Sequence, residues 1–160
     1  MSSKIQNINE LFQTIQVLKK MHQTIILTNG CFDLLHIGHV RLLTQAKKIG
    51  DILLVAVNSD QSIRQLKGAI RPIIPENERL EMIASLQAVD YVFLFNDLTP
   101  VNIIEQIKPD IFIKGSGYSI ENLPEYSSVK KYGGKVVTFA SLAPFSTSQI
   151  IEKIKKQEGH

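Results

Sequence analysis

Two histidines of this chain, His36 and His39, are separated by two residues, Ile37 and Gly38. A short apolar run ending at Thr28-Asn29-Gly30 precedes them, and apolar residues at helical spacing follow, which predicts a strand, a turn and a helix that begins near Gly38. The N-terminus of a helix offers unpaired N–H groups and a partial positive charge, and glycine lets backbone approach a ligand closely. Two imidazoles at that place can donate hydrogen bonds to phosphate oxygens. The segment therefore predicts a site that binds a phosphorylated compound and stabilises charge on phosphorus.

The histidine pair has two other interpretations. Two polar residues can satisfy each other in an ordinary turn, although the glycine and the strand and helix on either side favour the phosphate site. A metal site is the second alternative. The other histidines are His22 and the terminal His160, and no cluster of cysteines or carboxylates accompanies the pair, so we expect no metal bound by the protein alone.

Polar and basic residues follow the second apolar run. Asn58 and Asp60 come directly after it and are candidates to contact a substrate, while capping of a helix at Ser59 or Asp60 is an equally good explanation. Lys67, Arg71 and Arg79 lie in or near a connection that contains Gly68 and Pro72, and together they form a candidate anion clamp. Basic residues of this kind are also common on surfaces that bind nothing.

Two later segments complete the set of candidates. Lys114-Gly115-Ser116-Gly117-Tyr118 follows the fourth apolar run, and its glycines favour a close approach of backbone to a ligand or a plain turn. Three hydroxyl residues, Ser146, Thr147 and Ser148, open the last periodic segment. They can cap a helix there, hold a phosphate, or do both.

These candidates are positioned by short apolar runs that alternate with longer segments of helical periodicity. The runs are rich in Val, Ile and Phe, as is typical of strands buried on both faces, and span Thr24–Leu27, Ile52–Val57, Tyr91–Phe95, Asp110–Ile113 and Lys135–Phe139. The periodic segments are Ile8–Met21, Val40–Ile49, Asn77–Ala88, Val101–Ile107 and Ser146–Lys156. This alternation predicts an α/β, Rossmann-like three-layer fold with a mostly parallel five-stranded sheet. Ligands bind such sheets at the carboxyl ends of strands. Residues 1–22 are expected to form an N-terminal helical extension to a domain of residues 23–157, with Asn7 and Glu10 capping its helix.

The Gly30-Cys31-Phe32-Asp33 segment with His36-Ile37-Gly38-His39 resembles the HxGH signature of the cytidylyltransferase-like nucleotidyltransferase superfamily. That resemblance implies attack on the α-phosphate of a triphosphate with release of pyrophosphate. In order along the chain, further matches resemble the heptose 1-phosphate adenylyltransferase family, the adenylyltransferase domain of ADP-heptose synthase, over about residues 24–155. These matches are Ala56-Val57-Asn58-Ser59-Asp60, Leu66-Lys67-Gly68, Arg71-Pro72, Arg79, Lys114-Gly115 and Ser146-Thr147-Ser148. The chain has Gly117 where the family commonly has Asp.

The resemblance implies that AMP passes from ATP to a sugar 1-phosphate in the synthesis of lipopolysaccharide precursors. His36, His39 and Lys67 would be catalytic, and Mg²⁺ would arrive with ATP. The nucleotide would contact Asn29, Gly30, Cys31, Phe32, Gly38, His39, Lys114, Gly115, Ser146, Thr147 and Ser148. The phosphorylated substrate would contact Asp33, Asn58, Asp60, Arg71 and Arg79. Transfer from CTP to glycerol 3-phosphate, adenylylation of flavin mononucleotide, and a nucleotide sensor without turnover are the alternatives.

Composition limits the remaining possibilities. The 160 residues fit one domain, and the hydrophobic share of 44% with a charged share of 21% argues against disorder. A net charge of +3, an aromatic share of 7% and no tryptophan give little support to nucleic-acid binding. No apolar run approaches the ~20 residues of a membrane span, and no signal peptide is evident at the start. A single cysteine excludes an internal disulfide. We therefore expect a cytoplasmic enzyme, and from the family resemblance a homodimer.

Overall fold

The structure of the chain is a computed structural model that describes residues 2–115, 119–139 and 146–158. Within these residues one sheet contains five strands, all parallel, in the order β3-β2-β1-β4-β5. The strands are β1 (Ile25–Gly30), β2 (Ile52–Asn58), β3 (Tyr91–Phe95), β4 (Ile111–Lys114) and β5 (Lys135–Thr138). The predicted α/β class with a parallel five-stranded sheet is confirmed.

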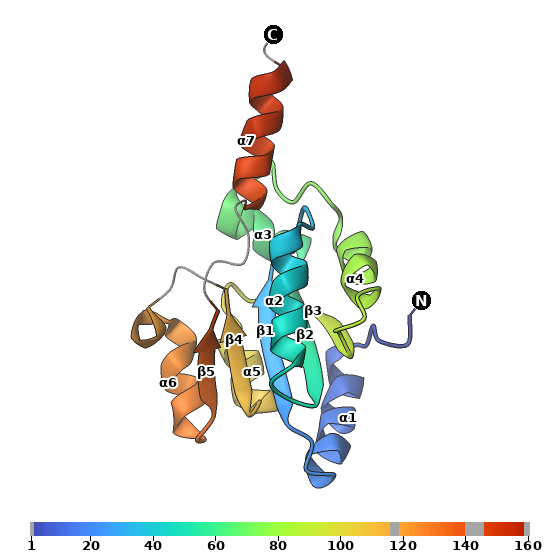
Figure 1. Cartoon of the computed structure of the whole chain (residues 1–160), viewed down its shortest axis with the longest axis vertical. Coiled ribbons are helices and arrows are strands. Elements are labelled where there is room, and N and C mark those ends of the chain that lie inside the picture. Colours follow the sequence, from blue (N-terminus) through green and yellow to red (C-terminus); the bar gives the residue numbers. More distant parts are fainter. Residues whose placement is uncertain (1, 116–118, 140–145, 159–160) are drawn as a thin grey trace.

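Helices cover both faces of this sheet (Figure 1). They are α1 (Ile8–Lys20), α2 (Ile37–Lys47), α3 (Asp60–Lys67), α4 (Glu76–Ala84), α5 (Val101–Ile107), α6 (Pro124–Lys131) and α7 (Thr147–Glu158), with a 3-10 turn, η1, at Ile120–Asn122. Because successive strand residues point to opposite faces, β1 contributes side chains to two separate clusters of buried apolar residues, one on each face of the sheet. Ile25 and Leu27 pack with α1, α5 and α6, whereas Ile26 packs with α2 and α4. The result is the predicted three-layer arrangement.

The N-terminal helix α1 shares the core of the sheet. Leu11 and Ile15 are at most 1% exposed and belong to the same apolar cluster as Phe93 and Phe112. The side chain of Asn7 accepts a hydrogen bond from the backbone N–H of Glu10 at 3.0 Å, as expected for the helix N-terminus. The extension predicted for residues 1–22 is thus packed against the rest of the chain.

The sheet order creates a point where the chain changes direction. From β1 the chain proceeds to β2 and β3 on one side, and then returns to place β4 against the other side of β1. The loops that leave β1 and β4 therefore diverge at the carboxyl edge, which is where open parallel sheets of this kind bind ligands. In Figure 1, α3 and the start of α7 lie at this end of the sheet, and α7 extends away from the body.

Candidate active site

A cavity of about 530 Å³ opens at the carboxyl ends of β1, β2 and β4. Its walls come from the loop after β1, the end of α3, the loop before α5, and the segment that follows β4. The lining residues are Asn29, Gly30, Cys31, Phe32, His39, Leu42, Asn58, Leu66, Lys67, Leu98, Thr99, Pro100, Lys114, Gly115, Asn122, Leu123, Pro124 and Glu125. Nine residues predicted to bind nucleotide, to bind substrate or to act in catalysis are therefore brought together here: Asn29, Gly30, Cys31, Phe32, His39, Asn58, Lys67, Lys114 and Gly115.

The turn after β1 depends on a close contact between Gly30 and Phe32. A Cβ on Gly30 would lie 3.0 Å from the Phe32 ring, so any larger residue would require the ring to shift. Phe32 itself has φ +46° and is 3% exposed, which shows that its packing overrides an unfavourable backbone conformation. Its ring and that of His39 meet in a T-shaped contact, with centroids 5.2 Å apart and an interplanar angle of 60°. The turn thereby fixes the position of a predicted catalytic residue.

The two histidines form a stacked pair at the start of α2. Their ring centroids are 3.8 Å apart with an interplanar angle of 29°. Nδ1 of His36 accepts a hydrogen bond from the Gly38 N–H at 3.1 Å, and Nδ1 of His39 accepts one from the His36 N–H at 3.3 Å. Both side chains thus cap the helix, as the turn interpretation predicted, and His39 also lines the cavity. His36 is not among the lining residues.

Burial keeps this pair uncharged. It lowers the pKa of His36, and it lowers the pKa of His39 to about 4 with a smaller contribution from the neighbouring His36. A neutral imidazole carries one proton, and since each Nδ1 accepts a hydrogen bond, that proton lies on Nε2. The pair therefore presents N–H donors to a ligand without positive charge.

Asp33 binds the loop between α3 and α4 to the site. The carboxylate is 1% exposed, and it accepts hydrogen bonds from Nε of Arg71 at 2.5 Å and from the backbone N–H groups of Ile73 and Ile74, each at 2.9 Å. All of these partners are internal, and neither Asp33 nor Arg71 lines the cavity. Both were predicted to contact substrate; in the structure their hydrogen bonds hold the loop between α3 and α4.

Arg79 is fully buried in α4 and connects three segments. Its guanidinium donates to the carbonyls of Ile74 at 2.9 Å and Cys31 at 2.5 Å, and to Oδ1 of Asp60 at 2.8 Å. Asp60 in turn stands in the first turn of α3, and its N–H donates to Glu76 at 2.7 Å. Neither Arg79 nor Asp60 lines the cavity, so this predicted pair of substrate ligands lies behind its wall.

Lys67 and Asn58 approach the cavity from the β2 side. Lys67 is the last residue of α3, its side chain is exposed, and its charge acts on the thiol of Cys31. Burial nevertheless raises the pKa of that thiol, so Cys31 is protonated at neutral pH.

Asn58 is 3% exposed, and its amide donates to the hydroxyl of Ser62 at 3.0 Å. Ser59 caps α3 through the N–H of Ser62, as the capping alternative predicted.

The opposite wall carries an ion pair that sequence reasoning missed. Nζ of Lys114 lies 2.6 Å from Oε1 of Glu125 and 3.3 Å from Oδ1 of Asn29. Glu125 is in the first turn of α6 and is 1% exposed. Its Oε2 is buried with no hydrogen-bond partner in the described part of the chain. Pro124 at the start of α6 was the available sequence signal, because proline is favoured at the first position of a helix.

Of the three hydroxyl residues at the start of α7, Ser146 caps the helix. Oγ of Ser146 accepts from the Gln149 N–H at 3.3 Å, and the Ser146 N–H donates back to the Gln149 side chain at 2.8 Å. Thr147 donates to the carbonyl of Leu34 at 3.3 Å, which fastens α7 to the turn after β1. These hydroxyls do not line the cavity as it stands, and neither does Ser148. Gly117, the position that departs from the family pattern, lies outside the described residues.

The described residues contain no group of three or more His, Cys, Asp or Glu side chains that could hold a metal ion. Among the same residues, no helix is long and apolar enough to cross a membrane.

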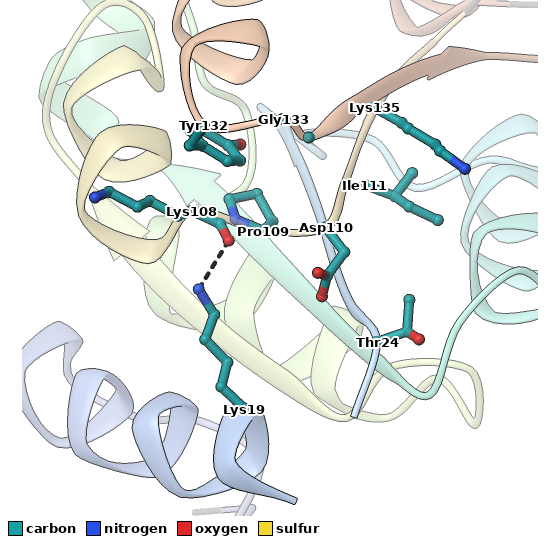
Figure 2. Close-up of a pocket in the computed structure, with 10 residues that line it drawn as sticks. Lys19, Thr24, Lys108, Pro109, Asp110, Ile111, Tyr132, Gly133 and Lys135 are labelled. Carbon is teal, nitrogen blue, oxygen red and sulfur yellow. Dashed lines mark hydrogen bonds between the residues drawn. The ribbon is translucent and has the colours of Figure 1, made fainter. Parts of the chain in front are cut away.

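A second pocket, of about 470 Å³, lies at the opposite edge of the sheet between α1, α5 and the turn before β5 (Figure 2). Lys19 reaches across it and donates to the carbonyls of Ile107 at 2.5 Å and Lys108 at 2.8 Å. Burial lowers the pKa of Lys19, against the opposing effect of Asp110. In Figure 2 the side chains of Lys108 and Lys135 point away from each other, so the lysines do not converge on one point. The hydrogen bonds of Lys19 in this pocket connect α1 to the end of α5.

Comparison with known proteins agrees with this geometry. A model of the family described as cytidylyltransferase-like matches residues 27–153, which include every residue of the cavity wall. The chain belongs to the cytidylyltransferase-like family. It is 42% identical to a protein named bifunctional protein HldE from Geobacter sulfurreducens, over 98% of this chain, and 46% identical to one of the same name from Citrifermentans bemidjiense, over 95%. The chain spans about a third of the length of these relatives (32% and 31%).

One similar solved structure is titled as that of a lipopolysaccharide core biosynthesis protein from Thermoplasma volcanium GSS1. It is 33% identical to this chain with a TM-score of 0.64, and the match covers 76% of this chain and 99% of that one. The resemblance to the nucleotidyltransferase superfamily, first indicated by the histidine pair, is thereby confirmed at the level of the family.

Proposed function

We propose that this chain transfers AMP from ATP to a sugar 1-phosphate, a heptose 1-phosphate, to give an ADP-sugar and pyrophosphate for lipopolysaccharide or other surface-glycan precursors. The observation that carries the proposal is the neutral, stacked histidine pair at the start of α2, with His39 facing a cavity at the carboxyl edge of the sheet. Such a site offers N–H donors at a helix N-terminus, which suits charge that develops on a transferring phosphorus.

The reaction is a displacement at the α-phosphorus. A phosphate oxygen of the sugar 1-phosphate forms a bond to that phosphorus while the bond to the bridging oxygen breaks, and pyrophosphate leaves with the electron pair. His39 donates its Nε2–H to an oxygen whose negative charge grows in the transition state, and His36 supports it by stacking. Lys67, at the β2 side of the cavity, neutralises the incoming phosphate or the leaving pyrophosphate.

In this proposal Mg²⁺ is bound mainly by the nucleotide rather than by the protein. Among the described residues that line the cavity, Glu125 is the one carboxylate, and it is already paired with Lys114. A hard cation that prefers several oxygen ligands would therefore be held by the phosphates and by water rather than by protein side chains. When bound, it supplies charge neutralisation across the triphosphate.

The buried ion pairs behind the cavity take a positioning role in this proposal. Asp33 with Arg71, and Asp60 with Arg79, fix the loop that follows Lys67, so they act on substrate through that lysine and its neighbours. In this proposal Ser146, Thr147 and Ser148 meet the phosphates when α7 moves toward the cavity on binding. The bond from Thr147 to the Leu34 carbonyl supports this role, because it holds the start of α7 at the turn after β1.

The choice of acceptor is supported by the relatives. Two proteins named HldE and one titled for lipopolysaccharide core biosynthesis are similar to most of this chain. Glycerol 3-phosphate with CTP, and flavin mononucleotide with ATP, are the competing pairs within the family's chemistry. Homodimeric assembly and a cytoplasmic location complete the proposal, and light scattering of the purified protein tests the first of these.

A panel of triphosphates against acceptors, read by pyrophosphate release, tests the activity. ATP with heptose 1-phosphate is expected to give the highest kcat/KM, and His39→Ala is expected to lower it by about 10²–10³-fold, as removal of one preorganised donor does elsewhere. His22→Asn is the matched control, because His22 has φ +58°, which asparagine tolerates, and lies outside the cavity wall. A wild-type protein that binds ATP yet releases no pyrophosphate with any acceptor would instead be a nucleotide sensor.

A further inference from the structure

Glu125 is the buried polar group that the catalytic scheme above does not use. Its side chain lies in the cavity wall at the start of α6 and is 1% exposed. Oε1 is paired with Lys114 at 2.6 Å, while Oε2 is shielded from solvent and has no partner in the described residues. A carboxylate paired with a lysine is an acceptor only, so Oε2 can be satisfied solely by an N–H or O–H donor.

A buried carboxylate oxygen without a hydrogen bond is energetically unfavourable, and a ligand that donates a hydrogen bond to it would remove this cost. Leaving a buried acceptor without a partner destabilises a protein, and more so when the group is charged. Lys114 cannot swing away to relieve it without loss, since its ammonium also contacts Oδ1 of Asn29 at 3.3 Å. The carboxylate is thus held in place in the wall of a cavity that receives the substrate, with one acceptor atom unused.

The charges in the cavity wall indicate which part of the substrate would contact Oε2 of Glu125. A phosphate would be repelled by the carboxylate, and the phosphate-binding features, His39 and Lys67, lie in other parts of the wall. Beside Glu125 the wall is formed by Leu123, which is 6% exposed, and by Pro124. An apolar surface next to one fixed acceptor fits a flat aromatic ring that carries an amino group on its edge.

We propose that Glu125 selects the nucleobase, with Oε2 accepting a hydrogen bond from the exocyclic amino group of the base. This inference rests on the proposed function, because it assigns the segment after β4 to the nucleotide rather than to the sugar phosphate. Adenine and cytosine both carry such an amino group, whereas hypoxanthine carries a carbonyl at the corresponding position. Glu125 is then a specificity residue, and Lys114 positions it.

The first test uses the wild-type chain and needs no acceptor. Calorimetry in the presence of Mg²⁺ compares ATP with purine riboside triphosphate, which lacks only the amino group. Because a hydrogen bond to a charged group contributes about 1.5–3 kcal/mol, ATP is expected to bind ~10- to 100-fold more tightly. Equal dissociation constants for the two triphosphates would overturn the inference while leaving nucleotide binding intact. Absence of binding by any triphosphate would overturn the proposed function and this inference with it.

The second test reverses the hydrogen bond. In Glu125→Gln the amide can donate to a carbonyl, so the ratio of kcat/KM for ITP to that for ATP is expected to rise at least ~10-fold over wild type. Glu125→Asp keeps a charge for Lys114 but withdraws the acceptor, and its preference for ATP over purine riboside triphosphate should fall to within about threefold. An equal loss with all triphosphates in both variants would mean that Glu125 only supports the fold, and would refute base selection.

Glu105→Gln serves as the matched control. Glu105 pairs with Ser128 at 2.9 Å from α5, outside the cavity wall, so the triphosphate preference of this variant should equal that of wild type. Thermal melting of the three variants shows whether each is folded under the assay conditions. A change of base preference in Glu105→Gln would show that the effect is not specific to the cavity, and would contradict the assignment.

Discussion

Substitution of Asp33 tests whether its buried ion pair with Arg71, rather than direct contact with substrate, links the loop between α3 and α4 to the site. Asp33→Ala removes the acceptor for two backbone N–H groups, those of Ile73 and Ile74, and the partner of Arg71. The carboxylate is 1% exposed and the side chain of Arg71 is 12% exposed, so water replaces these contacts poorly.

The magnitude follows from this burial. Breaking a buried pair by removing one partner costs about 3–5 kcal/mol, and each N–H left unsatisfied is part of that sum. For a domain of this size 1 kcal/mol changes Tm by about 2–4 °C, so we expect Asp33→Ala to lower Tm by roughly 10 °C. Asp33→Asn keeps an oxygen for the backbone N–H groups and loses only the charge, so its loss should be about half as large.

Chemical denaturation of a double-mutant cycle isolates the pair. Asp33→Asn, Arg71→Gln and the double variant should give a coupling energy of about 1–3 kcal/mol, as is typical of residues in direct contact. In the pyrophosphate assay, both single variants should raise KM for the sugar phosphate more than KM for ATP, because the loop follows Lys67. A coupling below about 0.5 kcal/mol, with unchanged KM values, would refute the positioning role.

Three further predictions concern the turn after β1, the histidine pair and α1. Gly30→Ala places a Cβ 3.0 Å from the Phe32 ring, so we expect chemical denaturation to show a free energy of unfolding lower by about 1–3 kcal/mol. The control is Gly133→Asn, at φ +84° in an open turn, which should lower it by less than about 1 kcal/mol. Since the folded-state pKa of His39 is lowered to about 4, the unfolded chain binds more protons below pH 6.5, and the free energy of unfolding should fall by up to about 3 kcal/mol between pH 6.5 and 4. The pH dependence should be shallower in His39→Gln, and an equal slope in both proteins would contradict the shift. Lys19→Met removes the bonds to the carbonyls that end α5 and should cost about 1–2 kcal/mol, whereas Lys20→Met, on the exposed side of α1, should cost less than about 0.5 kcal/mol.

The sequence predicted the elements whose residues are buried on a regular pattern. β2 reads as an uninterrupted apolar run because both of its faces are covered, and five of the helices show an apolar face at helical spacing. α6 was missed, and α3 was anticipated only through the capping alternative at Ser59 or Asp60. Each has eight residues, most of them polar, and α3 buries only Ser62 and Ile63. In such short helices the caps and the tertiary contacts decide the structure, and periodicity has too few residues to be seen.

The ion-pair partners of the charged residues could not be predicted from the sequence, for a different reason. Arg71 and Asp33 are 38 positions apart, and Lys114 and Asn29 are 85 apart, so their contacts depend on how strands are ordered in the sheet. Residue type and spacing identified the histidines and the loop after β1, because those features are local. They could not show which basic residues already have a carboxylate partner.

That pairing changes the electrostatics of the site. Asp33 neutralises Arg71, Asp60 neutralises Arg79 and Glu125 neutralises Lys114, while the histidines carry no charge at neutral pH. Lys67 is then the lining cation for which the described residues give no carboxylate partner, and the N-terminus of α2 adds only a partial charge. These two features cannot balance the charge of a triphosphate together with a phosphorylated acceptor. In the proposed reaction a divalent cation carried in by the nucleotide would supply the remainder, and the described residues of the protein would contribute oriented N–H donors.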